Sequence, residues 1–130
     1  MSLPALLPLV TDETRFFWEA GRDGTLRIAR CRSCGFFSHP PYPRCPCCTS
    51  ADVGPAAVSG NGTIYSFTVK ETPEGAAVIA LVELDEQLGL RLLTNVVECD
   101  PAAVRIGLRV RVQFRAAGDV WLPLFVPAVA

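Results

Sequence analysis

The stretch that decides the fold is CRSCGFFSHPPYPRCPCC, residues 31–48. It holds two C-x2-C units, and ten residues lie between them. Each unit turns two sulfurs to one side of the backbone, and two such turns supply the four soft ligands that a structural zinc ion takes in a tetrahedron. We therefore predict a zinc site with the ligands Cys31, Cys34, Cys45 and Cys48. Because four protein ligands close the coordination sphere, the predicted role of the metal is structural.

The residues beside the cysteines refine this prediction. Gly35 suits the tight backbone of the first turn, whereas Thr49 stands at the same place in the second turn. We therefore expect a slightly different geometry in the second turn. Arg30, Arg32 and Arg44 flank the cysteines and are expected to soften the negative field of four thiolates around a divalent metal.

Other interpretations of the cysteines remain open. The thiols can form disulfides, although these are rare in the cytosol. They can form a redox-active pair, or remain as core residues without metal. Cys47 reaches the metal only through a less favourable turn, so it is interpreted as a non-ligand, and Cys99 as a small buried residue. His39, the single histidine, can serve as a general base or as a packing residue.

Downstream of the cysteines the sequence has the patterns of β-strands. In residues 108–115 every even position is apolar and every odd one polar, which predicts a half-buried strand with a basic outer face. The other segments of strand composition are 63–70, 76–84, 90–98 and 120–126. Pro123 and Pro127 predict an edge position for the last strand. Five strands, with only residues 101–104 as a possible helix among them, favour a small barrel.

Upstream, the sequence predicts a helix over residues 11–20, capped by Thr11 or Asp12, and then a strand over 25–30 that leads into the first cysteine pair. The predicted fold class is mainly β, with an N-terminal helix, a small zinc ribbon and a five-stranded barrel. We expect the chain to divide into three parts: a tail and helix at 1–24, the ribbon at 25–52, and the barrel domain at 53–130.

Composition narrows the classes of function. Of the 130 residues, 50% are hydrophobic and 19% charged, and the net charge is −1. The net charge is +2 for residues 1–50, −6 for 51–100 and +3 for 101–130. A general nucleic-acid binder is usually far more basic, so nucleic acid is not the expected partner. A small domain this apolar is expected to cover part of its surface with a partner chain.

The apolar segment 3–10 is far shorter than a membrane span, and it lacks the features of a secretory signal. We therefore expect no membrane span and a cytoplasmic location. Two interpretations of this segment stay open: a disordered terminus, or an extended tail that lies on a partner.

Several segments occur together in one order. They are FFWEA at 16–20, CRSCG at 31–35, PPYPRCPCC at 40–48, VSGNGTIYSFTV at 58–69 and IGLRVRV at 106–112. This series resembles the DUF35 family, in which a rubredoxin-like zinc ribbon is joined to an OB-fold associated with acyl-CoA. The resemblance extends over roughly residues 11–127, and it departs from the family at Thr49, where glycine is usual, and at the added Cys47.

The resemblance implies a function that spacing alone does not show. It implies a non-catalytic accessory subunit that binds or positions an acyl-CoA. The subunit is then a scaffold for a thiolase-like enzyme, such as a lipid-transfer-type aldolase, or for a MaoC-like enoyl-CoA hydratase. The implied setting is steroid or lipid side-chain breakdown, in a hetero-oligomer whose catalytic residues lie largely on the partner.

Two groups of residues are candidates for these contacts. CoA requires cations near its phosphates, and the candidates are Arg91, Arg109, Arg111 and Arg115. The alternative is that these arginines form only a solvated strand face. The candidates for partner contact are Phe36, Phe37, Tyr42, Phe16 and Trp18. The alternative is that Phe36 and Phe37 pack the ribbon onto the barrel.

Two other classes of function are kept in view. Zinc ribbons and OB-folds also bind single-stranded nucleic acid, for which Tyr65 and Phe67 could stack on bases. A small hydrolase or thiol enzyme would instead use His39 or Cys47.

Overall fold

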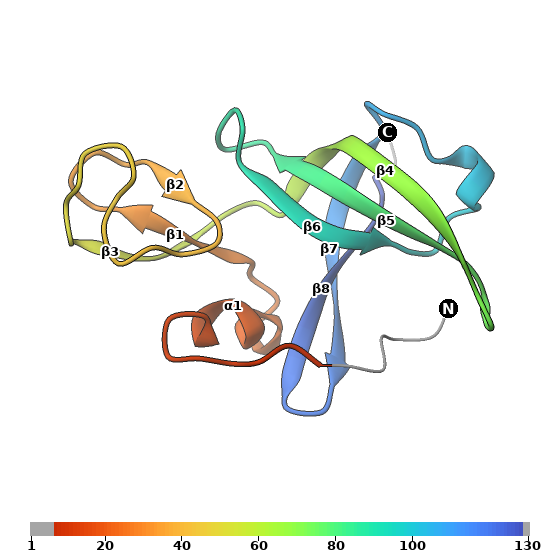
Figure 1. Cartoon of the computed structure of the whole chain (residues 1–130), viewed down its shortest axis with the longest axis horizontal. Helices are drawn as coiled ribbons and strands as arrows, with labels where there is room; N and C mark the ends of the chain where they lie inside the picture. Colours follow the sequence, from red (N-terminus) through yellow and green to blue (C-terminus); the bar gives the residue numbers. More distant parts are fainter. Residues whose placement is uncertain (1–6, 129–130) are drawn as a thin grey trace.

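The computed structural model describes residues 7–128, in which two small sheets are joined by a short linker (Figure 1). Residues 1–6, which include part of the apolar segment considered above, and residues 129–130 lie outside the described range. In the described part, residues 7–10 belong to no helix or strand. Among residues 7–128, no helix has the length and apolar character that crossing a bilayer requires.

The first sheet carries the cysteines. Its central strand is β1 (Arg27–Cys31), flanked by β2 (Phe37–Ser38) and β3 (Val53–Ala57), and both pairings are antiparallel. β3 pairs along the whole of β1, from Ala57 opposite Arg27 to Val53 opposite Cys31. Residues 53–57 are thus part of the ribbon sheet, and we propose a boundary between ribbon and barrel after Ala57.

The N-terminal helix is shorter than the predicted segment 11–20. Only α1 (Arg15–Trp18) is α-helical, and η1 (Ala20–Arg22), a 3₁₀ turn, follows it. The Thr11 N–H donates to Thr14 Oγ1 at 3.0 Å, and the Thr14 N–H donates back to the Thr11 carbonyl at 3.2 Å. These bonds close a separate turn before α1, so the helix begins after Thr14 and neither predicted capping residue acts as a cap.

The second sheet is a closed barrel, which confirms the predicted five-stranded architecture. Its strands are β4 (Asn61–Thr72), β5 (Gly75–Leu84), β6 (Arg91–Val96), β7 (Arg109–Ala117) and β8 (Val120–Pro127). They close in the order β4-β5-β6-β8-β7. The possible helix between the third and fourth strands is the short 3₁₀ turn η2 (Pro101–Ala103).

The prediction of an edge position for β8 is wrong. β8 lies between β6 and β7, and it is antiparallel to β7 over its whole length. Its pairing with β6 is confined to one register position, Val96 opposite Phe125. A strand that shares so few hydrogen bonds with one neighbour can accommodate Pro123 and Pro127 without standing at an edge.

One hydrophobic core serves both sheets. Leu26, Ile28 and Phe37 of the ribbon pack in the same buried cluster as barrel residues such as Val82 and Phe125. Ile28, Val82 and Phe125 are all 0% exposed. The ribbon is therefore packed against the barrel, and its position is set by burial as well as by the linker.

Candidate functional site

The two C-x2-C units fold into the same hydrogen-bonded turn. In the first unit the Gly35 N–H donates to the Cys31 carbonyl at 2.8 Å, and in the second the Thr49 N–H donates to the Cys45 carbonyl at 2.9 Å. The N–H of each leading cysteine also donates to the carbonyl five residues ahead, at 2.9 and 2.8 Å respectively. The two halves of the site are thus built alike.

The expected difference between the turns is not found. Gly35 has φ of 83° and Thr49 has φ of 67°, so both adopt the left-handed conformation. This conformation is unfavourable for a β-branched residue. The hydrogen bonds of the turn therefore hold Thr49 where glycine would sit without strain.

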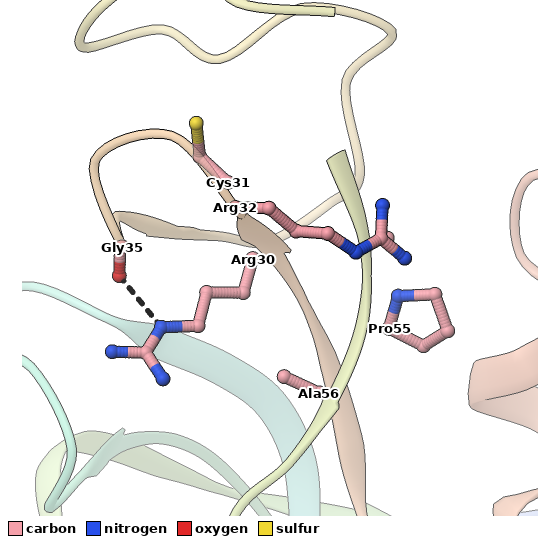
Figure 2. Close-up of a pocket in the computed structure, with 7 residues that line it drawn as sticks. Arg30, Cys31, Arg32, Gly35, Pro55 and Ala56 are labelled. Atoms are coloured by element: carbon pink, nitrogen blue, oxygen red, sulfur yellow. Dashed lines mark hydrogen bonds between the residues drawn. The ribbon is translucent and has the colours of Figure 1, made fainter. Parts of the chain in front are cut away.

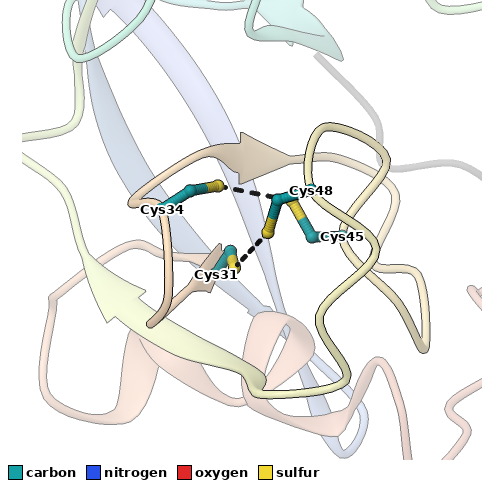
Figure 3. A group of neighbouring side chains, drawn as sticks. All are labelled: Cys31, Cys34, Cys45 and Cys48. Atoms are coloured by element: carbon teal, nitrogen blue, oxygen red, sulfur yellow. Dashed lines mark hydrogen bonds between the residues drawn. The ribbon is translucent and has the colours of Figure 1, made fainter.

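The four predicted ligands converge between the two turns (Figure 3). Their sulfurs all lie within 4.8 Å of one another, with 3.6 Å between Cys31 and Cys48 and 3.6 Å between Cys34 and Cys45. In a tetrahedral site with Zn–S bonds of about 2.3 Å, neighbouring sulfurs are ~3.8 Å apart. The spacing fits a metal ion bound by four thiolates, and all six cysteines are free thiols.

The backbone polarises these sulfurs unequally. The Cys34 N–H bonds to the Cys31 sulfur and, with help from the Ser33 N–H, lowers the pKa of Cys31 to about 6 despite burial. The Phe36 N–H acts to lower the pKa of Cys34, but burial and the adjacent sulfurs outweigh it and raise this pKa to about 12. Four thiols this close cannot all ionise unless positive charge lies among them, which is what a metal ion supplies.

Two arginines donate hydrogen bonds to the two cysteine turns. The Arg30 Nε donates to the Gly35 carbonyl at 2.9 Å (Figure 2), and the Arg44 Nη1 donates to the Thr49 carbonyl at 3.1 Å. Each arginine thus stabilises the residue in the left-handed conformation of its turn. Both carbonyls are at corresponding positions, so the bracing repeats in the two halves of the site.

A groove of about 380 Å³ lies beside the first turn, against β1 and β3 (Figure 2). Its lining residues are Arg30, Cys31, Arg32, Gly35, Gly54, Pro55 and Ala56. Arg32 is held at the groove by an ion pair with Asp52 at 2.8 Å. The expected cations are therefore close to the cysteine cluster, although their bonds go to carbonyl and carboxylate oxygens.

The side chains of Cys47, His39 and Cys99 are not members of the sulfur cluster. Cys47 is exposed, and its N–H donates to the Cys45 sulfur at 3.3 Å. The His39 ring packs against Phe17 with 4.9 Å between ring centres, and burial lowers the pKa of His39. Cys99 is half-buried and packs against the main core. His39 thus occupies the position of a packing residue.

The aromatic residues that were expected to contact a partner differ in their exposure to solvent. Phe37 is buried at 6% exposure in the main core and Phe36 is half-buried, which agrees with the packing alternative for Phe37. Tyr42 is 49% exposed and Phe16 half-buried, and both line an apolar groove of about 260 Å³ between the N-terminal segment and the proline-rich loop. Trp18 is half-buried against the core.

The four candidate arginines do not form one cluster. Arg109 makes a two-point ion pair with Asp85, both contacts at 2.7 Å. Arg91 lies over the Tyr65 ring at 3.7 Å from its centre. Arg111 and Arg115, farther along β7, form no ion pair with any group of residues 7–128.

The two aromatic residues of β4 do not share a face. Phe67 pairs opposite Ala80 and packs against the barrel core, whereas Tyr65 is exposed. The register shifts between Ile64 and Ser66, so the regular alternation of side chains between the two faces of β4 is interrupted at Tyr65. A stacking platform of two aromatic rings is therefore not formed by these residues.

The loop between β5 and β6 makes side-chain hydrogen bonds to the ribbon and the linker that the sequence did not reveal. Gln87 accepts from the Phe37 N–H and donates to the Phe37 carbonyl, both at 2.9 Å. Glu86 accepts from the Ser59 N–H in the linker at 2.8 Å. The sequence marks residues 85–89 only as a turn, because a side-chain bond to a residue so distant in the chain has no local signature.

Comparison with known protein families agrees with this architecture. Residues 18–54 match the family described as "ChsH2, rubredoxin-like zinc ribbon domain", and residues 56–115 match "ChsH2, C-terminal OB-fold domain". A solved structure described as "Ltp2-ChsH2(DUF35) aldolase" contains a chain 38% identical to this one. The match has a TM-score of 0.84 and covers 95% of this chain and all of the other.

Relatives with assigned names fall into two groups. A "probable enoyl-CoA hydratase alpha subunit" of Thermomonospora curvata is 38% identical over 94% of this chain. A "3-oxo-4,17-pregnadiene-20-carboxyl-CoA hydratase alpha subunit" of Mycobacterium tuberculosis is 38% identical over 82%. The chain spans only 40% and 35% of the length of these two relatives. A "DUF35 domain-containing scaffold protein" of Methanothermobacter thermautotrophicus is 31% identical, over 82% of this chain and 84% of the relative.

Proposed function

This chain belongs to the DUF35 family of ChsH2-type proteins, and from that membership we propose that it is a non-catalytic accessory subunit. It positions an acyl-CoA and is a scaffold for a thiolase-like aldolase or an enoyl-CoA hydratase. The observation that carries the proposal is the full-length likeness to the chain in the "Ltp2-ChsH2(DUF35) aldolase" structure. The name of the relative from Mycobacterium tuberculosis supports a steroid or lipid side-chain pathway.

We propose that the metal is Zn²⁺, bound by Cys31, Cys34, Cys45 and Cys48. The spacing of the sulfurs and the all-thiolate donor set support this assignment. Four protein ligands fill a tetrahedral sphere, so the ion stabilises the ribbon and is not a site of reaction. None of the six cysteines, all within residues 7–128, is in a disulfide, which supports a cytoplasmic location, where thiols stay reduced.

Acyl-CoA contact is proposed for the basic face of β7. Arg111 and Arg115 are the better candidates for the CoA phosphates, because their guanidinium groups have no ion-pair partner among residues 7–128. Arg109 and Arg91 each face a carboxylate of this chain, from Asp85 and Glu83 respectively. Alanine at Arg111 should therefore weaken acyl-CoA binding more than alanine at Arg91.

Partner contact is proposed for the groove lined by Phe16 and Tyr42. Tyr42 lies between the two cysteine pairs, on a loop held at both ends by the metal turns. A side chain on such a loop loses little conformational entropy when it docks, which favours it as an anchor. Trp18 and Phe36 lie half-buried and contribute less surface, and Phe37 packs in the core.

The experiment that tests the function is co-expression. This chain is co-expressed in turn with a thiolase-like aldolase subunit and with an enoyl-CoA hydratase subunit, and the product of each co-expression is sized by light scattering. We expect a stable hetero-oligomer that binds an acyl-CoA ester in calorimetry, with weaker binding by the Arg111→Ala complex. A chain that stays monomeric and binds neither type of enzyme nor CoA esters contradicts the proposal.

A further inference from the structure

A row of exposed apolar side chains crosses one wall of the barrel, away from the cysteine cluster. Leu93 on β6 is 68% exposed, Tyr65 on β4 is 46% exposed and Ile106, just before β7, is 69% exposed. Leu81 on β5 is half-buried and pairs directly opposite Leu93. These four residues are called the apolar row below.

The pairing of the strands makes this row continuous. β4, β5 and β6 run side by side on one wall of the barrel (Figure 1). Leu81 pairs with the residue that follows Tyr65, where the register shift leaves the Tyr65 side chain exposed. The Gly107 N–H donates to the Ile64 carbonyl at 2.8 Å, which brings Ile106 beside this part of β4.

A charged row runs parallel to the apolar row. In register across four strands lie Arg91, Glu83, Thr63 and Arg109. Arg91 faces Glu83 at 3.4 Å, and Arg109 is paired with Asp85 at 2.7 Å. Two cations and two carboxylates thus balance one another on this wall, and the face carries no net charge from these groups.

We infer that the apolar row and the charged row together form a docking surface for a folded protein, and that its occupant is the partner subunit of the proposed function. This inference rests on that proposed function. Contiguous apolar side chains at this level of exposure mark an interaction site on a small domain. An apolar centre beside a charge-balanced polar margin is the arrangement found at protein–protein interfaces.

The charges decide which kind of partner fits. A polyanion such as single-stranded nucleic acid needs unpaired cations, and here Arg91 and Arg109 are matched by carboxylates. It also needs open aromatic faces, and the Tyr65 ring is covered by the Arg91 guanidinium. A protein surface with an apolar centre and polar groups of both signs complements this wall.

The pair of Tyr65 and Arg91 supplies a rigid centre for the interface. The guanidinium lies 3.7 Å from the centre of the ring, so each side chain limits the motion of the other. Tyrosine and arginine are enriched among residues that dominate binding energy. No hydrogen bond of the Arg91 guanidinium is formed within residues 7–128. With its Nε facing Glu83 at 3.4 Å, Arg91 presents a cation beside a carboxylate, so polar groups of both signs are expected opposite this pair.

The test compares Leu93→Glu with Leu88→Glu in the intact chain. Leu88 is 91% exposed but lies in the β5–β6 loop outside the row, so it is a matched control for the same change. The probe is the aldolase or hydratase subunit that co-elutes with the wild-type chain, titrated by calorimetry. We expect Leu93→Glu to raise Kd at least tenfold and Leu88→Glu to leave it within twofold. Thermal melts verify that both variants fold.

Four further outcomes are decisive. Protection from hydrogen exchange of residues 63–66 and 91–95 in the complex supports the inference. If the Leu93→Glu and Tyr65→Ala variants bind the enzyme as tightly as the wild-type chain does, the proposed surface is wrong and the proposed function stands. If the wild-type chain binds neither enzyme, both the surface and the function are wrong. Salt-sensitive binding of oligothymidylate that is lost in Tyr65→Ala overturns the choice of a protein occupant.

Discussion

At the scale of single residues, Thr49 shows how a turn can hold a side chain against its own conformational preference. Its φ of 67° matches that of the glycine in the other cysteine turn, and two hydrogen bonds to its backbone keep it there. The metal site thus takes priority over local backbone energy. The position is a place where the chain can be made more stable without touching a ligand.

We expect Thr49→Gly to stabilise the protein. The left-handed conformation costs a non-glycine residue about 1–2 kcal/mol, and the extra freedom of glycine in the unfolded chain offsets about 0.5–1 kcal/mol of the gain. The net expected increase in the free energy of unfolding is about 0.5–1 kcal/mol, measured by urea denaturation of the metal-loaded protein. Thr49→Ala is the control, because alanine keeps the backbone strain, and a gain equal to that of glycine would argue against strain at this position.

Asp85 gives a prediction about pH. The hydrogen bonds from Arg109 hold the pKa of Asp85 below its ordinary value of 3.8. A carboxylate with a lowered pKa in the folded state contributes stability that is present above the ordinary pKa and is lost as pH falls through the folded value. Asp85→Asn should therefore lower stability at pH 7, but only slightly, because both groups are more than a third exposed. The deficit should shrink as pH falls below 3.8. Urea titrations of both proteins across this range provide the measurement, and a deficit that persists at low pH would mean that the ion pair is not its cause.

At the scale of elements, the β5–β6 loop joins the two sheets through side chains. Gln87 satisfies both the N–H and the carbonyl of Phe37, as a neighbouring strand would. Phe37 is itself buried, so these backbone groups have little access to water. The loop therefore fixes the ribbon on the barrel at the strand that follows the first cysteine turn.

Loss of the hydrogen bonds between Gln87 and Phe37 should lower the free energy of unfolding. Gln87→Met keeps the length of the side chain but leaves a donor and an acceptor on Phe37 unpaired, which costs about 1–3 kcal/mol per buried group. We expect a lower urea midpoint and faster hydrogen exchange at the Phe37 amide. Leu88→Ala, at the exposed neighbouring position, should change neither, and equal effects of the two variants would show that the loop as a whole matters and not the amide contact.

The sequence predicts the elements unequally well, for physical reasons. The cysteine spacing and the alternation in residues 108–115 depend only on neighbours along the chain. The four cysteines lie together and the strand is found, as expected. The extent of the N-terminal helix depends on the competing Thr11–Thr14 turn. The position of β8 depends on barrel closure, and the role of Gln87 on a residue far away in the chain. Such long-range contacts leave no periodic mark in the sequence.

At the scale of the whole molecule, the ribbon and the barrel share one core. Ile28 and Phe37 pack with barrel residues, and Ile28 is three residues from the first ligand, Cys31. Loss of the metal should thus loosen a strand that is part of the common core. The stability of the barrel is expected to depend on the occupancy of the cysteine cluster.

We therefore predict that removal of the metal lowers the stability of the whole chain. A zinc chelator, or Cys34→Ser, should lower the melting temperature of the whole chain and abolish partner assembly, because binding of the ion contributes folding free energy. Cys47→Ser should keep one zinc per chain in elemental analysis and change stability by no more than about 0.5 kcal/mol. Equal metal loss in the two serine variants would contradict the assignment of ligands, and an unchanged melt after chelation would contradict the coupling of ribbon to barrel.

The closed order of the barrel strands has a consequence for how such chains diversify. In the wall of β4, β5 and β6 the central strand β5 is paired on both sides, so another polypeptide cannot join it by adding a strand of its own. A partner at the proposed docking surface must therefore be recognised by outward-facing side chains. These can be substituted one at a time without loss of the hydrogen bonds between the barrel strands. One frame can then serve enzymes of unlike chemistry, as the names hydratase, aldolase and scaffold among its relatives illustrate.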